Sequence, residues 1–382
     1  MKFVHISDTH LGAAQYRKIS DSGYNQREED IKDAFKDAVI QIIELNPDFV
    51  VHAGDLFDSA RPTNRMIHFA LEQILHIVEK IPLVIISGNH DTPKQRFSGS
   101  VFNIFEEISH LKPNLHVIFK NEYMPVEFTF NGTPVTIHAI PQCTEDPIFR
   151  EQLKRVKIKP GKNILTLHAG VTGMREFSHG DFNELLIDSK YFDEVPFDYV
   201  ALGHFHNYSN VGRNAYFSGS TERTSFNEAR VDKGFLYVDL ENGGKPQFYR
   251  TPCREMIELP SIFAGGKDTT TLSSEIEKTL MSIDPTGKLV RIKIEKISPH
   301  ILATLDIKKF RDMMSKATHF EPIFEKTDEK GNIEQIKVSI GGVKEEFNSF
   351  VDAYGALTKE EKERFKLQGQ EYLNRASEEE IE

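Results

Sequence analysis

Five short segments of the sequence place metal-ligand side chains directly after an apolar run. They supply carboxylates, imidazoles and one amide: Asp8 and His10, Asp55, Asn89 with His90, His168, and His204 with His206. This mixture of donors suits divalent ions of intermediate hardness such as Mn²⁺, Fe²⁺ or Zn²⁺, whereas an all-oxygen set suits Mg²⁺ or Ca²⁺. The repetition predicts one metal centre assembled from five strand ends.

This set of side chains is too large for a single ion. Two ions need a bridging group, and Asp55 is the natural choice because its two carboxylate oxygens can face different ions about 3.5 to 4 Å apart. Such a pair can clamp an in-line displacement at phosphorus. The residue types therefore indicate chemistry on a phosphate ester.

The elements that must position these side chains follow from the hydrophobic pattern. Short runs rich in Val, Ile, Leu or Phe predict strands buried on both faces over residues 2–6, 48–52, 82–87, 164–167 and 199–202. Apolar residues recurring at three and four predict helices over residues 27–45, 63–80 and 99–110. This alternation predicts a layered α/β sheet, in which ligands bind beyond the carboxyl ends of the strands.

The order of the ligand blocks resembles the five-block signature of the calcineurin-like metallophosphoesterases. The blocks are Ser7-Asp8-Thr9-His10, Gly54-Asp55-Leu56-Phe57-Asp58, Gly88-Asn89-His90-Asp91, His168 and Gly203-His204-Phe205-His206. Within that superfamily, Leu11-Gly12 and Arg61-Pro62 beside these blocks resemble the DNA double-strand-break repair nucleases of the SbcD type. The resemblance extends over residues 1–239 and is weaker beyond.

The resemblance implies a role for each site residue. It assigns one ion to Asp8, His10, Asp55 and His206, and the other to Asp55, Asn89, His168 and His204, with two Mn²⁺ expected per chain. His90 becomes a catalytic residue that protonates the leaving 3′ oxygen or steadies the pentacoordinate phosphorus. Many relatives carry a histidine three residues after the bridging aspartate, where this chain has Asp58.

The activity implied is a manganese-dependent DNA nuclease, both 3′ to 5′ exonuclease and endonuclease, that acts in double-strand-break repair. The expected partner is an ABC-type ATPase of the SbcC type with a long coiled coil. A small-substrate phosphodiesterase of the same superfamily shares every ligand, but it would have little use for the C-terminal third of this chain. A scaffold whose chemistry is secondary to assembly is a third hypothesis, against which the intact ligand set argues.

Three domains are expected. Residues 1–250 should form an α/β metallophosphoesterase β-sandwich flanked by helices, residues 251–335 a small α+β cap domain, and residues 336–382 a helical hairpin. In the cap, strands are expected over 254–259, 289–297 and 320–327, and helices over 272–283 and 306–316. The hairpin helices are expected over 343–355 and 359–375.

The resemblance implies that the hairpin docks on the ATPase. Its predicted contact residues are the apolar ones at helical spacing: Phe347, Phe350, Val351, Tyr354, Phe365 and Tyr372. A hairpin folded onto its own cap is the alternative. A homodimer within a heterotetramer is also implied, through Met66, Ile67, Ala70, Val101, Phe102 and Phe105, although a role in the core would explain these residues equally well.

The net charge of −11 is unusual for a protein that binds DNA, because phosphate contacts call for clustered lysine and arginine. Bound ions would neutralise the ligand carboxylates, and residues 343–382 hold 11 acidic side chains against 6 basic ones. Arg61, Lys94 and Arg96 follow the second and third ligand blocks and are the predicted DNA contacts. A solvated surface is the alternative for each of them.

Composition places further limits on function. With 382 residues, 39% hydrophobic and 27% charged, and no apolar run of membrane-spanning length, the chain is expected to be cytoplasmic with no membrane contact. Cys143 and Cys253 lack the spacing of a zinc or disulfide framework, so they are expected to be buried or partly buried thiols. His52 and His138 alternate with apolar neighbours and are expected to be hydrogen-bonded core or edge residues.

Overall fold

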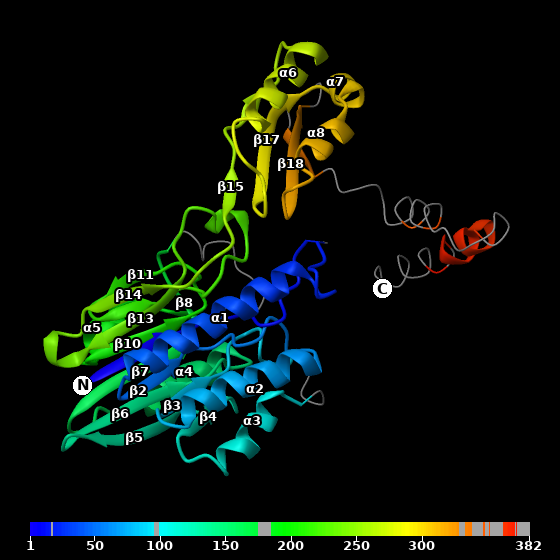
Figure 1. The fold of residues 1–382 in the computed structure, drawn as a ribbon. Helices are drawn as coiled ribbons and strands as arrows, with labels where there is room; N and C mark the ends of the chain where they lie inside the picture. The colour runs from blue at the N-terminus through cyan, green and yellow to red at the C-terminus, as the bar shows by residue number, and fades with distance from the viewer. Residues whose placement is uncertain are drawn as a thin grey trace. The chain divides into compact units, whose positions relative to one another are not determined.

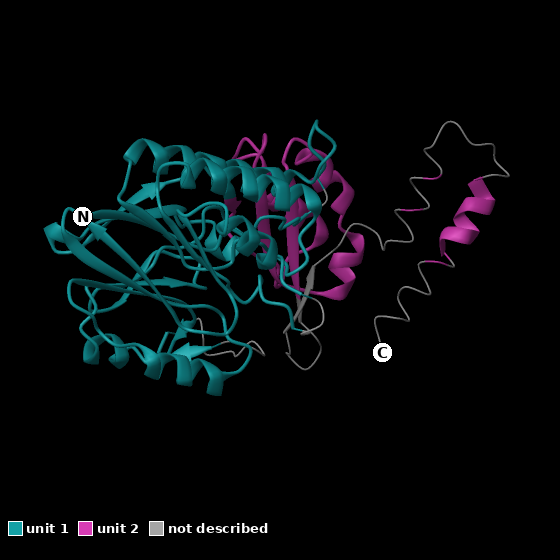
Figure 2. Ribbon diagram, turned by 90° about the horizontal axis from the view of Figure 1, so that it is seen from below, with its two compact units in different colours: residues 1–256 teal, residues 257–382 magenta. Residues whose placement is uncertain are grey.

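A computed structural model describes residues 1–16, 18–94, 99–174, 185–327, 333–337, 347, 351, 362–370 and 372. The chain divides into two compact units, residues 1–256 and 257–382 (Figure 2). The first boundary therefore lies at Met256, six residues beyond the predicted end of the first domain. The further division at residue 336 stays a prediction.

The first unit contains two six-stranded sheets. In one, the order is β14-β13-β1-β2-β3-β4, with β1 (Lys2–Ile6), β2 (Phe49–His52), β3 (Leu83–Ile86) and β4 (Leu115–Ile118) parallel. The antiparallel strands β13 (Gly234–Asp239) and β14 (Pro246–Arg250) complete its other edge. The first three predicted strands are thus neighbours, so their carboxyl ends lie along one edge of the sheet.

The second sheet has the order β11-β12-β10-β7-β6-β5. Its central strands β12 (Ala215–Phe217), β10 (Tyr199–Gly203), β7 (Lys162–His168) and β6 (Thr133–Ile140) are parallel. Strands β11 (Ser209–Gly212) and β5 (Met124–Phe130) are antiparallel edges, and β8 (Gly170–Val171) pairs separately with β9 (Leu186–Ile187). The two remaining predicted strands, β7 and β10, are again neighbours.

The sheets pack face to face because alternate side chains of each strand point to opposite faces. Phe3, Phe49 and Val84 of the first sheet share a core with Ile137, Ile164 and Tyr199 of the second. The intervening residues, such as Val4, Val50 and Ile85, belong to a separate core on the helical side. Both faces of the first sheet are therefore buried, which explains the continuous apolar runs in the sequence.

Helices cover the outer face of each sheet. Helices α1 (Gln26–Leu45), α2 (Asn64–Val78) and α3 (Phe102–Ser109) lie against the first sheet (Figure 1), and α4 (Asp146–Arg155) and α5 (Lys190–Glu194) against the second. Asn25 caps α1 by accepting bonds from the Arg27 and Glu28 amides, and Thr63 caps α2. The predicted fold class, a layered α/β sandwich flanked by helices, is confirmed.

The second unit has its own sheet and its own core. Its strands are β15 (Met256–Glu258), β16 (Ile262–Phe263), β17 (Leu289–Ile297), β18 (His319–Thr327) and β19 (Ile333–Lys337). Helices α6 (Thr269–Leu280), α7 (Pro299–Thr304) and α8 (Ile307–Met313) pack with β17 and β18 around Ile276, Ile292, Phe310 and Phe324. This is the small α+β unit predicted for the cap.

Part of the C-terminal hairpin lies within the described residues. Phe347, Val351, residues 362–370 and Tyr372 are helical. A Cβ added at Gly369 would overlap the Phe347 ring, so the two helical segments touch there. None of the helices in the described part of the chain is long and apolar enough to cross a membrane.

His5 and His52 are uncharged histidines in the packed interior. His5 lies 3.2 Å (Nδ1) from the Tyr199 hydroxyl and 3.1 Å (Nε2) from the Leu202 carbonyl oxygen, and His52 Nε2 lies 2.9 Å from Thr9 Oγ1. Burial lowers the pKa of His5 to about 3 and that of His52 to about 4. The predicted core role of His52 fits these contacts.

We expect the metal-free protein to lose stability in mild acid. An unfolded chain binds protons at these imidazoles near pH 6.5, whereas the folded chain does not until about pH 4 or below, so stability is complete above pH 6.5 and falls as pH decreases. Each imidazole accounts for roughly 3 kcal/mol by pH 4. Urea unfolding of His5→Gln should show a shallower pH dependence than wild type. The exposed His68 provides the control variant His68→Gln, and equal slopes for all three proteins would contradict the expectation.

Candidate metal centre

The five ligand segments all follow the carboxyl ends of neighbouring parallel strands. Asp8 and His10 follow β1, Asp55 follows β2, and Asn89 follows β3; His168 ends β7, and His204 and His206 follow β10. The turns are tied together by backbone bonds from Asp8 N to Gly54 O (3.0 Å) and from His10 N to Asp55 O (3.1 Å). A further bond joins the sheets, from His204 N to Asp8 Oδ1 (2.9 Å). The sandwich therefore brings the predicted ligands to one edge.

Four of the ligand residues have a positive φ. Asp8, His10 and Asp55 have φ values of 52°, 51° and 54°, and His204 has 106°. Residues with a Cβ rarely adopt this conformation, and such observed strain clusters at functional sites. The unusual conformation occurs at four ligand residues of the same centre, in turns that lie side by side.

Glycines allow the turns to approach one another closely. A Cβ at Gly88 would overlap Oδ1 and the backbone nitrogen of Asp55, and a Cβ at Gly203 would overlap the Ala53 carbonyl oxygen. The Gly203 Cβ would also meet His168 Nδ1 at 2.8 Å. The glycine before each of these ligand blocks is therefore required by the packing of the centre.

Gly88→Ala should accordingly displace Asp55 and weaken metal binding. We expect at least a tenfold loss of Mn²⁺ affinity, because the neighbour in conflict is the ligand and its own backbone. Gly212→Ala is the control, since its added Cβ would meet Phe192 at an ordinary 3.5 Å. Calorimetric titration with Mn²⁺ measures both variants, and wild-type affinity in Gly88→Ala would refute this account of the turn.

The side chains form two groups that share Asp55. In the first, His10 Nε2 lies 3.0 Å from His206 Nε2 and 3.6 Å from Asp55 Oδ2, and Asp8 lies close to both histidines. In the second, His168 Nε2 lies 3.3 Å from Asp55 Oδ2. There Asn89 Oδ1 lies 2.9 Å from His168 Nε2 and 3.1 Å from His204 Nδ1. All seven predicted ligands are thus brought together, while their role as ligands stays a prediction.

The electrostatics of the centre favour cations. Asp8 and Asp55 are 0% and 1% exposed, and the groups found within ion-pair distance of Asp55 in the described part of the chain are the imidazoles of His10 and His168. Burial lowers the pKa of His168, but Asp55 and Asp8 outweigh it and raise the pKa to about 9. Burial likewise raises the pKa of Asp55, but His168 and His10 hold it well below its usual range. The residues therefore fit two divalent ions, which would supply the positive charge and leave the imidazoles neutral.

His90 lies beside the ligands and is exposed. Its backbone nitrogen donates to Asp55 Oδ1 (2.9 Å), and its Nδ1 lies 2.8 Å from the Asp58 carbonyl oxygen. A carbonyl oxygen only accepts, so Nδ1 carries a proton and Nε2 is the atom left to exchange a proton with a substrate. Its ring lies at 87° to that of His10, with 4.8 Å between the centroids.

Asp58 contacts two residues of the centre. Its carbonyl oxygen holds His90, and its carboxylate Oδ1 lies 3.4 Å from His10 Nδ1. The side chain remains 38% exposed. The Asp58 carboxylate therefore lies within ion-pair distance of His10, behind its Nδ1.

Asp91 is a residue whose importance the motif alone does not reveal. Its buried carboxylate accepts backbone bonds from Leu56 (3.1 Å), Phe57 (2.8 Å) and Gly88 (2.9 Å). Burial and the nearby Asp55 raise its pKa, against the effect of these bonds. Asp91 thus ties the turn after β2 to the turn after β3; the only sequence signal for this role is its place next to His90.

A second missed group lies behind His206. Thr224 and Glu228 contact His206 Nδ1, and Lys233 contacts Glu228 and the His206 carbonyl oxygen. These residues follow the last ligand block by 18 to 27 positions in an irregular segment. No periodicity or motif in the sequence connects them with the centre.

Two of the three residues predicted to contact DNA lie within the described part of the chain. Arg61 and Lys94 are exposed, and Arg96 lies outside the described residues. The neighbouring Arg65 is engaged within the protein, because it pairs with Glu28 (2.8 Å) and Glu29 (2.5 Å) and stacks on Tyr24. A role in DNA binding therefore stays a prediction for Arg61, Lys94 and Arg96.

The residues predicted for the dimer interface lie in the protomer's own core. Met66, Ala70, Val101, Phe102 and Phe105 are each at most 9% exposed and pack under the helices, and Ile67 is partly buried against them. They belong to the core between the helices and the first sheet. This burial supports the alternative role in the core, and the dimer interface stays a prediction.

The residues predicted to dock on the partner differ in how exposed their side chains are. Phe365 and Tyr372 are 50% and 73% exposed, Val351 is buried, and Phe347 packs near Gly369. Phe350 and Tyr354 lie outside the described residues. Docking on a partner stays a prediction, for which Phe365 and Tyr372 offer exposed apolar surface.

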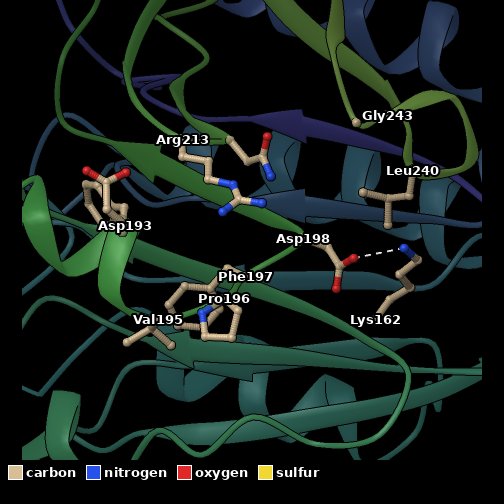
Figure 3. Close-up of a pocket in the computed structure, with 12 residues that line it drawn as sticks. Lys162, Asp193, Val195, Pro196, Phe197, Asp198, Arg213, Leu240 and Gly243 are labelled. Atoms are coloured by element: carbon tan, nitrogen blue, oxygen red, sulfur yellow. Dashed lines mark hydrogen bonds and ion pairs between the residues drawn. The ribbon is translucent and has the colours of Figure 1, made fainter.

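Other predicted features lie apart from the centre. His138 is hydrogen-bonded to the Tyr123 hydroxyl (2.8 Å) and Asn163 Oδ1 (3.0 Å), and both cysteines are free thiols. A pocket of about 270 Å³ is lined by Arg213, Leu240 and the ion pair of Lys162 with Asp198 (Figure 3). Lys162 begins β7 and Asp198 precedes β10, so this pocket lies at the amino ends of the strands, away from the metal centre.

A comparison with known protein families identifies the class to which this fold and site belong. Residues 1–208, more than half of the sequence, match the family described as calcineurin-like phosphoesterase. The chain belongs to the calcineurin-like phosphoesterase family, and the predicted resemblance is confirmed.

The sequence is also similar to individual named proteins. The chain is 34% identical over 256 residues to the DNA double-strand break repair protein Mre11 of Methanococcus maripaludis, covering 63% of each chain. It is 31% identical over 274 residues to the Mre11 of Methanocaldococcus jannaschii, covering 68% of this chain and 69% of that protein. A dimetal phosphatase from Danio rerio aligns over 62% of this chain and 92% of that one, with 13% identity and a TM-score of 0.36. The chain spans just under two thirds of the first relative's length.

Proposed function

We propose that this chain is a two-metal DNA nuclease, with 3′ to 5′ exonuclease and endonuclease activity, that works in double-strand-break repair. The observation that carries the proposal is the convergence of seven donor side chains into two groups that share Asp55. Two ions held in this way would activate a water and neutralise charge on the phosphate during an in-line displacement.

The side chains of the protein hold and orient the reacting groups. Asp55 bridges the two groups, and its Oδ1 also fixes the backbone of His90 at 2.9 Å. Because Nδ1 of His90 is held by the Asp58 carbonyl oxygen, Nε2 can donate a proton to the leaving 3′ oxygen. The described part of the site needs no protein nucleophile, since water supplies the attacking oxygen.

Manganese is the proposed resident metal. The predicted ligands are four imidazoles, two in each group, together with two carboxylates and one amide oxygen. Such a mixed set favours an ion of intermediate hardness over Mg²⁺, which prefers oxygen ligands and retained water. The metal content of protein purified without added metal would test this choice.

DNA as substrate is supported by the similarity to proteins named for DNA double-strand break repair. Arg61 and Lys94 are exposed just after the second and third ligand blocks, and we propose that they contact the phosphate backbone. A small-substrate phosphodiesterase remains the alternative, because it would use the same ligands. The second unit, which such an enzyme does not require, favours a large substrate.

An assay with two substrates separates these functions. Purified protein with Mn²⁺ is incubated with linear duplex DNA and, separately, with bis-p-nitrophenyl phosphate. Release of nucleotides from DNA supports the nuclease. Turnover of the small ester without any cleavage of DNA would overturn it.

We also propose that the chain acts as a homodimer with an ABC-type ATPase partner, docked through the C-terminal hairpin. Exposed Phe365 and Tyr372 support the docking surface. Deletion of residues 343–382 should abolish co-purification with the ATPase and leave hydrolysis of the small ester intact. Unchanged association would refute the docking role.

A further inference from the structure

A polar network encloses the side of His206 that faces away from the metal centre. Its Nδ1 lies 3.0 Å from Thr224 Oγ1 and 3.2 Å from Glu228 Oε1. The Thr224 hydroxyl donates to the same Glu228 oxygen at 2.7 Å, because an ionised carboxylate only accepts. Both groups therefore present acceptors to His206, so Nδ1 carries the proton and Nε2 keeps its lone pair for the centre.

Lys233 fixes this carboxylate in place. Its side chain is 0% exposed, and its Nζ lies 2.6 Å from Glu228 Oε2 and 2.6 Å from the His206 carbonyl oxygen. The backbone nitrogen of Thr224 donates to Glu228 Oε2 at 3.1 Å. One buried ammonium group thus holds both the carboxylate and the backbone of the histidine, and removal of either charge would leave the other buried and unpaired.

We propose that Glu228, held by Lys233 and Thr224, is a positioning residue that fixes the ring of His206 and directs Nε2 toward the ion shared with Asp8 and His10. Carboxylates behind histidine ligands set the tautomer and raise ligand basicity, and their loss costs about 10- to 100-fold in metal affinity. The inference rests on the two-metal centre of the proposed function and is independent of DNA as the substrate.

The histidines of the two groups are backed by different acceptors. Nδ1 of His168 lies 2.9 Å from the neutral carbonyl oxygen of Ala53. Nδ1 of His10 lies 3.4 Å from the carboxylate of Asp58, which is 38% exposed. The Glu228 carboxylate is closer to its histidine and is only 9% exposed. Loss of Glu228 should therefore weaken one of the two ions and spare the other.

Calorimetric titration of metal-stripped protein with Mn²⁺ tests this inference. Wild type should bind two ions, and Glu228→Gln should bind one with wild-type affinity and the other about 10- to 100-fold more weakly. Glu222→Gln is the matched control. Glu222 is buried in the same segment and accepts bonds from the Arg223 (2.6 Å) and Arg254 (3.0 Å) amides, so this variant should bind both ions as wild type does.

The protonated nitrogen of His206 gives a second readout that does not depend on activity. In ¹⁵N NMR of the Zn²⁺-loaded protein, His206 should show a proton on Nδ1 in wild type and a changed Nδ1 signal in Glu228→Gln. If that variant does not fold, Thr224→Val keeps the pair of Glu228 with Lys233 and should weaken the same ion several-fold. Wild-type affinity for both ions in the folded variants would overturn the inference. Two bound ions without DNA cleavage would instead overturn the proposed function and leave this inference standing.

Discussion

Asp55→Asn is expected to remove both metal ions and to reduce DNA hydrolysis by at least about 10⁴-fold. The loss is this large because Asp55 is the residue common to both ligand groups, lying 3.6 Å from His10 Nε2 and 3.3 Å from His168 Nε2. Two metal ions that stabilise a phosphoryl transition state lower the activation free energy by several kcal/mol. Each 1.36 kcal/mol changes the rate by about tenfold. Nuclease assays with Mn²⁺ and metal analysis of the same samples give the measurement.

Folding must be separated from metal loss in this variant. In wild type, Mn²⁺ at about 100 times its dissociation constant should raise the free energy of unfolding by about 2.7 kcal/mol per site. That increase should disappear in Asp55→Asn, while the metal-free protein still unfolds cooperatively. Asp198→Asn makes the same change just before β10 in the second sheet, away from the metal centre, and should retain both ions. Two tightly bound ions in Asp55→Asn would rule out the bridge.

His90→Gln should abolish most DNA cleavage while both ions remain bound. The ring is exposed beside the centre and is held by the Asp58 carbonyl oxygen at 2.8 Å, with no assigned role as a ligand. Loss of a positioned general acid lowers the rate by about 10²- to 10⁴-fold. Single-turnover cleavage of linear duplex DNA measures the rate, and calorimetric titration with Mn²⁺ measures binding.

The form of the substrate distinguishes a general acid from a structural residue. An ester with a good leaving group such as p-nitrophenolate needs little protonation, so His90→Gln should impair its hydrolysis far less than that of DNA. The control is His76→Gln, which changes an exposed histidine of α2. Equal losses on both substrates, or loss of the ions together with activity, would contradict the assigned role of His90.

The ligand set could be predicted because chemistry and fold coincide at the strand ends. Asp8, Asp55 and Asn89 each follow a strand that is apolar on both faces, and β1, β2 and β3 are parallel neighbours. Such runs are easily recognised in the sequence, and their carboxyl ends must meet at one edge. Strands β1, β2 and β3 of the first sheet could be predicted for the same reason. The short edge strands and the hairpin of β5 and β6 have no comparable apolar run in the sequence.

The residues that support the ligands could not be read from the sequence. Glu228 and Lys233 reach His206 from an irregular segment, and their pairing depends on how that segment folds back on the site. Asp91 stands beside the third ligand block, but its bonds to Leu56 and Phe57 cross between two turns. Contacts of this kind depend on tertiary structure, so the local sequence pattern does not predict them.

Apolar periodicity also fails to separate a core from an interface. Met66, Ala70 and Phe105 recur at helical spacing, which is equally typical of residues that contact a second protein and of residues that face the helix's own sheet. In this chain they are buried in the core that α2 and α3 share with the first sheet. The exposed side chains of the C-terminal hairpin, such as Phe365, are the stronger candidates for contact with another chain.

The central claim is that one aspartate bridges two divalent ions at the edge of the sandwich. Anomalous diffraction at the manganese absorption edge from crystals grown with Mn²⁺ tests it most directly. The account predicts two peaks about 3.5 to 4 Å apart, one on each side of the Asp55 carboxylate. A single peak, or two peaks that do not share Asp55, would contradict it.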